Sequence, residues 1–217
     1  MASRADFSAP GLRLERDLWQ QGIHYIGGMD EAGRGALAGP VAAAVVVLPP
    51  DPDSLGSLRH VRDSKLLAPL ERERAAEAVR ACALAWALGL ASASEIDAQG
   101  ILPATRLAMT RAVGALPFLP EYFLLDYIYW PQLAAPHLSI PKGEWHSLSI
   151  AAASVIAKTE RDRLLVELEA RYPGYGFARH KGYGTAVHRQ AIRRLGLSAE
   201  HRRSFCGSAL SLGDPQP

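Results

Sequence analysis

Residues 41–48 (VAAAVVVL) form an almost unbroken apolar run. Such a run is typical of a strand that is buried within a sheet. Another apolar stretch, residues 23–29, precedes it and also predicts a strand. Further strands are predicted at 84–91, at 122–125 and in a segment that ends near Ile140. Strands of this kind need helices packed on the sheet, so we expect an α/β or mixed three-layer domain.

Helices are predicted from apolar spacing and from end signals. Pro69 is placed to open one helix, Ser92 and Glu95 form a capping box for another, and Gly196 is placed to end a third. The predicted helices cover 70–82, a stretch after Ser92, 101–113, 149–172 and 187–195.

The composition is that of an ordinary globular protein. The 217 residues are 48% hydrophobic and 21% charged, which fits one domain with a substantial core. No stretch reaches the roughly 20 apolar residues of a membrane span, and the first residues carry no signal-peptide core. Cys82 and Cys206 are too far apart in sequence to indicate a disulfide framework or a zinc site. We therefore expect a cytoplasmic protein with a leader at 1–20, a domain at 21–206 and a tail at 207–217.

The net charge of +2 hides an asymmetry along the chain. Residues 158–203 contain eleven Lys and Arg against five Asp and Glu, whereas residues 1–157 contain thirteen against sixteen. A basic segment beside an acidic remainder fits a nucleic-acid backbone that meets a carboxylate metal centre. A solvated basic helix face would give the same pattern, so charge alone leaves both interpretations open.

The six residues 30–35 (DEAGRG) follow the first predicted strand. Asp30 and Glu31 are hard oxygen ligands of the kind that Mg²⁺ and Mn²⁺ prefer. Gly33 and Gly35 permit a close approach of the backbone to a ligand, and Arg34 suits an anionic, phosphate-bearing partner. The alternative is a strand-end acid followed by a solvated one. A metal site beside a phosphate-binding turn would point to phosphodiester chemistry.

Other acids and loops extend this pattern. Asp126 closes an apolar strand, where ligands bind in α/β sheets, and Glu144 follows another predicted strand. Each is equally compatible with an ordinary loop acid. Ser64 and Lys65, in the segment 63–65, are candidate phosphate ligands. Asp162 lies four residues after Lys158 on the long helix, which a surface ion pair explains.

Residues 172–185 (YPGYGFARHKGYGT) interleave aromatic, glycine and basic residues. Aromatic faces stack on sugars and bases, and Lys and Arg neutralise phosphates. The alternative is a glycine-rich loop whose aromatic side chains anchor it to the core. Because basic residues interrupt the aromatic ones throughout, we favour nucleic-acid contact for this segment.

These motifs, taken in order, resemble bacterial ribonuclease HII, the type 2 ribonuclease H. The resemblance covers residues 20–206. The matching segments are 30–40, 63–66, Asp126, 142–143, 149–163, 180–188 and 201–205.

The resemblance implies a ribonuclease H-like fold, with a central mixed β-sheet flanked by α-helices. It implies a divalent-metal-dependent endonuclease that cleaves the RNA strand of RNA–DNA hybrids. Such enzymes also nick duplex DNA 5′ of an embedded ribonucleotide, leaving 3′-hydroxyl and 5′-phosphate ends. Two Mg²⁺ or Mn²⁺ ions per site are implied. A monomer is expected, without a membrane, and a replication sliding clamp is a candidate partner.

The resemblance also implies residue roles. The catalytic carboxylates and metal ligands are Asp30, Glu31, Asp126 and Glu144. The residues implied to contact the substrate are Gly33, Arg34, Gly35, Ser64, Lys65, Lys142, Lys181 and Tyr183. Among these, residues 33–35 would read the ribose 2′-hydroxyl, which alone distinguishes a ribonucleotide from its deoxy counterpart, and Tyr183 would stack on the sugar at the RNA-to-DNA junction.

Two positions depart from the family pattern. Glu144 stands where the family has aspartate, and Tyr127 stands where it generally has glycine. An alternative function follows, namely an RNA–DNA hybrid- or junction-binding protein of the same fold with impaired catalysis. The related type with an added N-terminal binding domain is disfavoured, since about 20 residues precede the first predicted strand.

Overall fold

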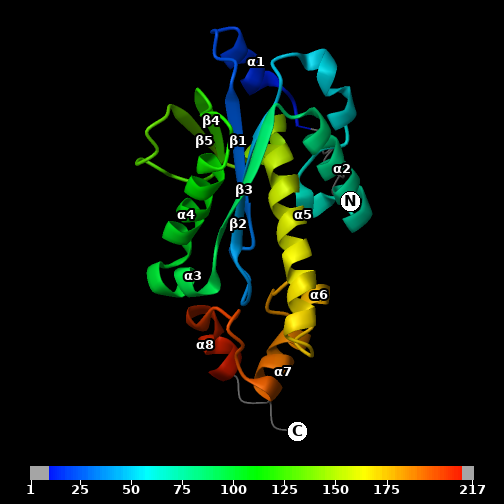
Figure 1. The fold of residues 1–217 in the computed structure, drawn as a ribbon, viewed down its shortest axis with the longest axis vertical. Coiled ribbons are helices and arrows are strands. Elements are labelled where there is room, and N and C mark those ends of the chain that lie inside the picture. The colour runs from blue at the N-terminus through cyan, green and yellow to red at the C-terminus, as the bar shows by residue number, and fades with distance from the viewer. Residues whose placement is uncertain (1–9, 212–217) are drawn as a thin grey trace, which may run out of the picture. The chain divides into compact units, whose positions relative to one another are not determined.

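The computed structural model describes residues 10–211, with side chains up to residue 207 (Figure 1). Contacts divide the chain into two compact units. The first unit comprises residues up to 30, 44–87 and 116–156, and the second comprises 31–43, 88–115 and the residues from 157 on. The single domain expected at 21–206 stays a prediction, and the expected tail falls largely on residues that the structure does not describe.

A five-stranded mixed sheet is flanked by helices, so the predicted α/β class is confirmed. The strands are β1 (Ile26–Ala32), β2 (Val41–Val47), β3 (Ala85–Ala91), β4 (Tyr122–Asp126) and β5 (His137–Ile140). Their order in the sheet is β3-β2-β1-β4-β5. β4 is parallel to both β1 and β5, and Met29 of β1 pairs with Leu125 of β4.

The five predicted helices are present as α2, α3, α4, α5 and α7, whereas α6 and α8 were not predicted. The α-helices are α1 (Arg13–Trp19), α2 (Pro69–Cys82), α3 (Ala93–Gln99), α4 (Ile101–Gly114), α5 (Leu148–Arg171), α6 (Phe177–His180), α7 (Ala186–Leu195) and α8 (Arg203–Ser211), and three short 3₁₀ helices are η1 (Pro52–Leu58), η2 (Ser64–Leu66) and η3 (Gly143–Trp145). The Ser92–Glu95 capping box forms as predicted, and Gly196 ends α7. No described helix is long and apolar enough to cross a bilayer.

The first strand begins three residues later than predicted and continues through Ala32. The backbone N–H groups of His24 and Tyr25 donate to the Glu121 carboxylate, each at 2.8 Å, so this part of the chain bonds to a side chain instead of the sheet. Asp30 and Glu31 consequently lie inside the strand instead of following it.

The core of the first unit joins the sheet to the beginning of α5. Ile26, Leu124 and Ile150 form a buried cluster, and side chains of the N-terminal segment pack against it. Gly28 permits this close packing, because a Cβ there would lie 2.2 Å from the carbonyl carbon of Ser149.

Part of the predicted leader belongs to this packing. Glu15 of α1 is buried, and its Oε1 accepts hydrogen bonds from the Ser147 hydroxyl at 2.6 Å and from the backbone N–H of Ser149 at 3.0 Å. These donors lie at the N-terminus of α5, where a carboxylate is stabilising. Glu15 therefore fixes the start of the longest helix from a distant point in the sequence.

Candidate active site

Two carboxylates lie on neighbouring parallel strands of the first unit. Asp30 follows the paired residue Met29 on β1, and Asp126 follows its partner Leu125 on β4. Neighbouring strands are about 4.8 Å apart, so the two acids lie side by side near the carboxyl ends of β1 and β4. Asp30 is only 3% exposed, a burial that an isolated carboxylate tolerates poorly.

Glu144 lies on η3, which contacts Asp126 at the end of β4. This turn is linked to Asp126, because the backbone N–H of Gly143 donates to Asp126 Oδ1 at 2.8 Å. Glu144 is buried, and its Oε2 has no hydrogen-bond partner among the described residues. Burial and then the negative charge of Asp126 raise the pKa of Glu144 to about 7.

Lys65 places a cation near these acids. The Asp63 carboxylate accepts a hydrogen bond from the Lys65 backbone N–H at 3.0 Å, which fixes the short η2 turn. Partial burial alone would lower the pKa of Lys65, but nearby carboxylates outweigh it and the net pKa is raised. The carboxylates responsible are Asp63, Asp30, Glu144 and Asp126. The charges of these four acids therefore all favour the protonated form of Lys65.

Two predicted substrate ligands in this unit have other contacts. The Ser64 hydroxyl is buried and lies 3.0 Å from the Ser154 hydroxyl, and the Ser64 carbonyl accepts a hydrogen bond from Arg72. Lys142 is exposed, with its ammonium 4.7 Å from the centre of the Trp145 ring. Substrate contact by Ser64 and Lys142 stays a prediction.

The DEAGRG turn belongs to the second unit from Glu31 on. Glu31 Oε1 accepts from Arg34 Nη1 at 3.0 Å, so the turn arginine is paired with the second acid of the motif. Gly33 has φ +90°, and a Cβ there would lie 1.9 Å from Nε of Arg161. Glycine is required at this position both by the backbone conformation and by the arginine beneath it.

Two buried arginines hold the loop that contains this turn. Arg161 donates to the carbonyls of Ala38, Pro40 and Lys181 at 2.9–3.1 Å. Arg202 donates to the carbonyls of Gly39 and Arg34 at 3.0 and 2.8 Å. Neither guanidinium is in an ion pair with any residue that the structure describes.

Burial lowers the pKa of both arginines, to about 9 for Arg202. Their role was not predicted from sequence, because nothing local distinguishes them from the solvated arginines around them. Position offers a weak signal for Arg161 only: it lies four residues after Ala157 and four before Leu165, on the buried face of α5.

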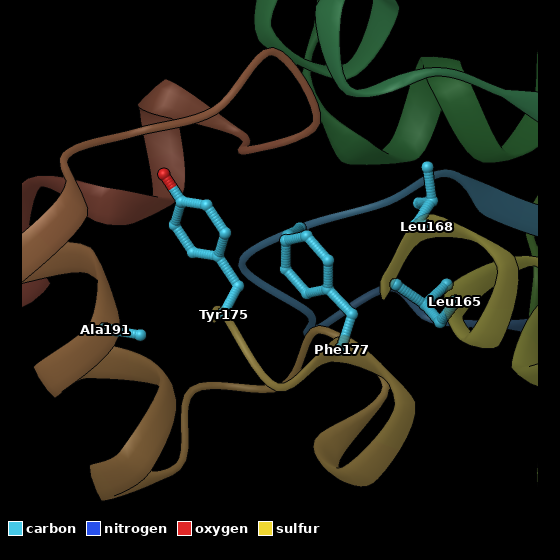
Figure 2. Packing of buried hydrophobic residues seen from close by; sticks show 6 residues of the cluster. Leu165, Leu168, Tyr175, Phe177 and Ala191 are labelled. Atoms are coloured by element: carbon cyan, nitrogen blue, oxygen red, sulfur yellow. The ribbon is translucent and has the colours of Figure 1, made fainter. Parts of the chain in front are cut away.

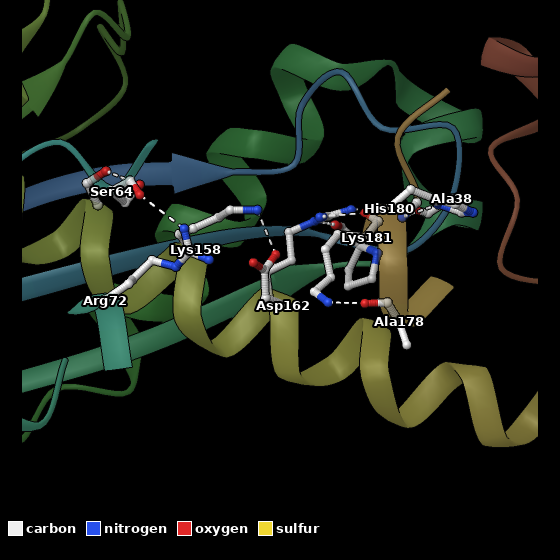
Figure 3. A network of polar contacts seen from close by, with 12 residues as sticks. Ala38, Ser64, Arg72, Lys158, Asp162, Ala178, His180 and Lys181 are labelled. Carbon is white, nitrogen blue, oxygen red and sulfur yellow. Dashed lines mark hydrogen bonds and ion pairs between the residues drawn. The ribbon is translucent and has the colours of Figure 1, made fainter. Parts of the chain in front are cut away.

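Tyr183 lies partly exposed beside two cations. Lys158 Nζ is 5.6 Å and Arg161 Cζ is 5.5 Å from the centre of its ring. Lys158 is also paired with Asp162 at 2.7 Å, as predicted, but their side chains are only 17% and 13% exposed, so this is not a surface pair (Figure 3). Lys181 has a left-handed backbone, and its ammonium donates to the Ala178 carbonyl.

The interpretation of residues 172–185 as aromatic contacts for nucleic acid is wrong for Tyr175 and Phe177. Both are buried, with Leu165, Leu168 and Ala191, in the core of the second unit (Figure 2). The two rings stack at 5.3 Å with an angle of 5° between their planes. The anchoring role, the alternative considered for this segment, is what the structure shows for these two residues.

Three buried histidines connect that core to Tyr183. His188 Nδ1 lies 2.9 Å from the Tyr183 carbonyl, and a carbonyl only accepts, so Nδ1 donates. His188 Nε2 then accepts from His201 Nε2 at 3.1 Å, and His201 Nδ1 accepts from the backbone N–H of Ser198 at 3.0 Å. His180 Nε2 likewise donates to the Tyr175 carbonyl at 2.8 Å. All three rings are thereby satisfied as neutral imidazoles.

Comparison with known proteins identifies the family. The ribonuclease HII family model matches residues 27–208. Ribonuclease HII of one strain of Thermus thermophilus is 51% identical over 192 residues, which are 88% of this chain and 91% of that protein. Ribonuclease HII of Geobacillus kaustophilus is 52% identical, covering 89% of this chain and 73% of that protein. The chain belongs to the ribonuclease HII family.

Solved structures agree on the fold. Ribonuclease H2 from Pyrococcus horikoshii matches with a TM-score of 0.68 and 25% identity, covering 85% of this chain and 96% of that one. Ribonuclease HIII from Bst, solved in complex with Mn²⁺, matches with a TM-score of 0.66 and 21% identity, covering 87% of this chain and 68% of that one. The expected ribonuclease H-like fold is confirmed, and this ribonuclease HII is a ribonuclease H, an endonuclease that acts on RNA–DNA hybrids.

The donor set fits a divalent cation. The orphaned Oε2 of Glu144, its raised pKa beside Asp126 and the effect of four acids on the pKa of Lys65 all indicate a region with excess negative charge. Within residues 10–207, however, no three His, Cys, Asp or Glu side chains are already gathered in a metal-binding group. Ligation would therefore require the carboxylates to draw together.

Tyr127, which the resemblance sets against a glycine, has φ +43°. A side chain in this left-handed region is strained, and glycine is not. The ring is 68% exposed, while the backbone N–H donates to the Ile140 carbonyl at 3.1 Å. Tyr127 thus adopts a backbone conformation that favours glycine.

Proposed function

We propose that this ribonuclease HII is a divalent-metal-dependent endonuclease that cleaves the RNA strand of hybrids and also nicks duplex DNA 5′ of a single ribonucleotide. The products are a 3′-hydroxyl and a 5′-phosphate. The observation that carries the proposal is the pairing of β1 with β4, which sets Asp30 beside Asp126, together with the hydrogen bond from Gly143 to Asp126, which brings the turn of Glu144 to them. Glu31, the next residue after Asp30, completes the proposed ligand set for two Mg²⁺ or Mn²⁺ ions.

The metals would activate the attacking water and stabilise the leaving 3′-oxygen. The protein would supply the remaining selectivity. The turn at Gly33, Arg34 and Gly35 would read the 2′-hydroxyl, since Arg202 holds the Arg34 carbonyl and Arg161 holds the Ala38 carbonyl of the same loop. The exposed part of Tyr183 would stack on the sugar at the junction, and Lys65, Lys142 and Lys181 would contact phosphates.

The decisive experiment uses duplex DNA with one embedded ribonucleotide, incubated with the purified protein and either Mg²⁺ or Mn²⁺. A nick on the 5′ side of the ribonucleotide is expected, with no cleavage of all-deoxy duplex. Binding without a nick under either metal would refute the catalytic proposal.

That outcome would favour the alternative, a hybrid- or junction-binding protein with impaired catalysis. One observation supports this alternative: burial and Asp126 raise the pKa of Glu144 to about 7, so this carboxyl is only partly ionised at neutral pH, whereas a metal ligand must be ionised. The Glu144→Asp variant should then recover cleavage, because the shorter side chain is the family residue.

Tyr183→Ala tests the stacking role. We expect cleavage at a single ribonucleotide to fall by about tenfold or more, the range found for loss of one stacking contact, while duplex binding changes little. Tyr129→Ala, at a second exposed tyrosine, is the control. Equal losses of cleavage and of duplex binding would contradict the assignment.

A sliding clamp is a proposed partner. A PCNA:RNase HII complex from Archaeoglobus fulgidus matches with a TM-score of 0.70 and 24% identity, covering 83% of this chain and 95% of that one. Size-exclusion chromatography with and without a bacterial sliding clamp would test both this partner and the expected monomer.

A further inference from the structure

A cavity of about 450 Å³ in the first unit is not used by the proposed function. It lies between the segment that follows η1 and one side of α2. Its apolar lining includes Val61, Leu67 and Ala75, all at most 7% exposed. The volume is within the range of about 300–1,000 Å³ that is usual for small-molecule sites.

The rest of the lining is strongly basic. Arg59, Arg62 and Arg74 contribute three guanidinium groups, against a single carboxylate from Glu71. That carboxylate is already engaged, because Glu71 Oε2 accepts from the backbone N–H of Ala68 at 2.9 Å. The cavity therefore combines an apolar wall with an excess of positive charge.

The guanidinium groups have donors to spare. Neither Arg62 nor Arg74 forms an ion pair or side-chain hydrogen bond with any described residue, and Arg62 Nε is buried without a partner. Arg59 uses only Nε, which donates to His60 Nε2 at 3.0 Å. A buried N–H without a partner is costly, so an anionic acceptor in the cavity would relieve a penalty that the protein carries without one.

We propose that this cavity binds a phosphate-bearing ligand of nucleotide size. The phosphate would accept from Arg62 and from the guanidinium donors of Arg59 and Arg74, whose fork geometry matches phosphate oxygens. The nucleoside would pack on Val61 and Leu67. The ligand is either a free nucleotide or one nucleotide of a nucleic-acid strand, since both present this chemistry.

Occupancy would also affect the neighbouring segment. Arg62 directly precedes Asp63, whose carboxylate holds the backbone of Lys65, and Lys65 lies near the strand-end acids. A ligand bound to Arg62 would thus restrain the segment that positions Lys65.

Calorimetry on the full-length protein tests the site directly. The probes are ADP, adenosine, inorganic pyrophosphate and an all-deoxy DNA duplex, without added metal. For a free-nucleotide site we expect ADP to bind more tightly than pyrophosphate and adenosine not to bind. Arg62→Gln and Arg74→Gln should each weaken ADP binding by about tenfold, as expected for loss of a charged hydrogen bond.

Arg80→Gln is the matched control, because Arg80 lies on the same helix but does not line the cavity. If the site instead takes a strand nucleotide, ADP will not bind, and duplex affinity will fall in the Arg62 and Arg74 variants but not in the control. If ADP binds no more tightly than about 1 mM and the duplex is bound equally by all variants, the proposal is wrong. These outcomes are independent of cleavage, so they do not depend on the proposed function.

Discussion

Replacing Glu144 by Gln tests whether Glu144 is a poorly solvated carboxyl beside the charge of Asp126. Glu144 is 6% exposed, and its pKa is raised from an ordinary 4.5 to about 7, first by burial and then by Asp126. The folded protein therefore binds a proton between these pH values that the unfolded chain has already released. Glu144 thus makes the free energy of unfolding fall as pH rises from 4.5 to 7, with no further change above that.

The magnitude follows from the two pKa values. One pH unit of displacement corresponds to about 1.4 kcal/mol, so the ionised Glu144 costs the folded state about 3 kcal/mol at pH 8 and under about 1 kcal/mol at pH 5. Glutamine has nearly the same shape and never ionises. The Glu144→Gln variant should therefore be similar to the parent at pH 5 and more stable by about 2–3 kcal/mol at pH 8.

The assay is urea unfolding in a chelating buffer at pH 5, 6, 7 and 8. Glu95→Gln is the control, because the Arg111 guanidinium lowers the pKa of Glu95 to about 2 and this carboxyl does not titrate in the window. Its stability difference from the parent should be constant across the four pH values. Mg²⁺ or Mn²⁺ at pH 8 should stabilise the parent more than the Glu144→Gln variant. A Glu144→Gln difference that does not vary with pH would refute the reasoning.

Two further predictions concern stability. Tyr127→Gly should stabilise the protein by up to about 1 kcal/mol, because it relieves the left-handed strain at φ +43°, whereas Tyr129→Gly should destabilise it. Thermal unfolding of both variants decides this, and a destabilised Tyr127→Gly would contradict it. Burial lowers the pKa of His188 and of His201 to about 4, so both rings resist protonation when folded but not when unfolded. The two histidines should therefore contribute a loss of about 2 kcal/mol or more from pH 7 to pH 5, which opposes the gain from Glu144. His188→Asn should lose less stability than the parent over this range, and equal slopes in urea unfolding would refute the assignment.

Much of the fold was predictable because its signals are local. The helix opened by Pro69, the capping box at Ser92 and the stop at Gly196 each depend on a few adjacent residues, and all three form as predicted. The start of β1 was not predictable, since it depends on Glu121, far away in sequence, which removes two N–H groups from the sheet.

The candidate site likewise contains residues that could be predicted from local sequence and residues whose surroundings depend on the fold. Asp30 and Asp126 could be proposed as neighbours because both end apolar strands, and the register of β1 with β4 places them so. Tyr175 and Phe177 were assigned to nucleic acid because their neighbours are basic. Their true surroundings include His188 and His201, which the fold brings to them from another segment. The buried positions of Arg161 and Arg202 likewise follow from backbone carbonyls, which carry no signature in the sequence.

The strand register also determines which acids of the candidate site can change position when the sequence changes. The separation of Asp30 and Asp126 is set by backbone hydrogen bonds between two parallel strands, so neither side chain can change its place without moving the sheet. Glu144 lies instead on a three-residue 3₁₀ turn, whose Gly143 N–H donates to Asp126. The candidate site thus has two acids fixed by the sheet and one acid, Glu144, on a turn that can shift. Laboratory selection for altered ion preference should find its permissive substitutions at residues 142–145, while the strand acids stay unchanged.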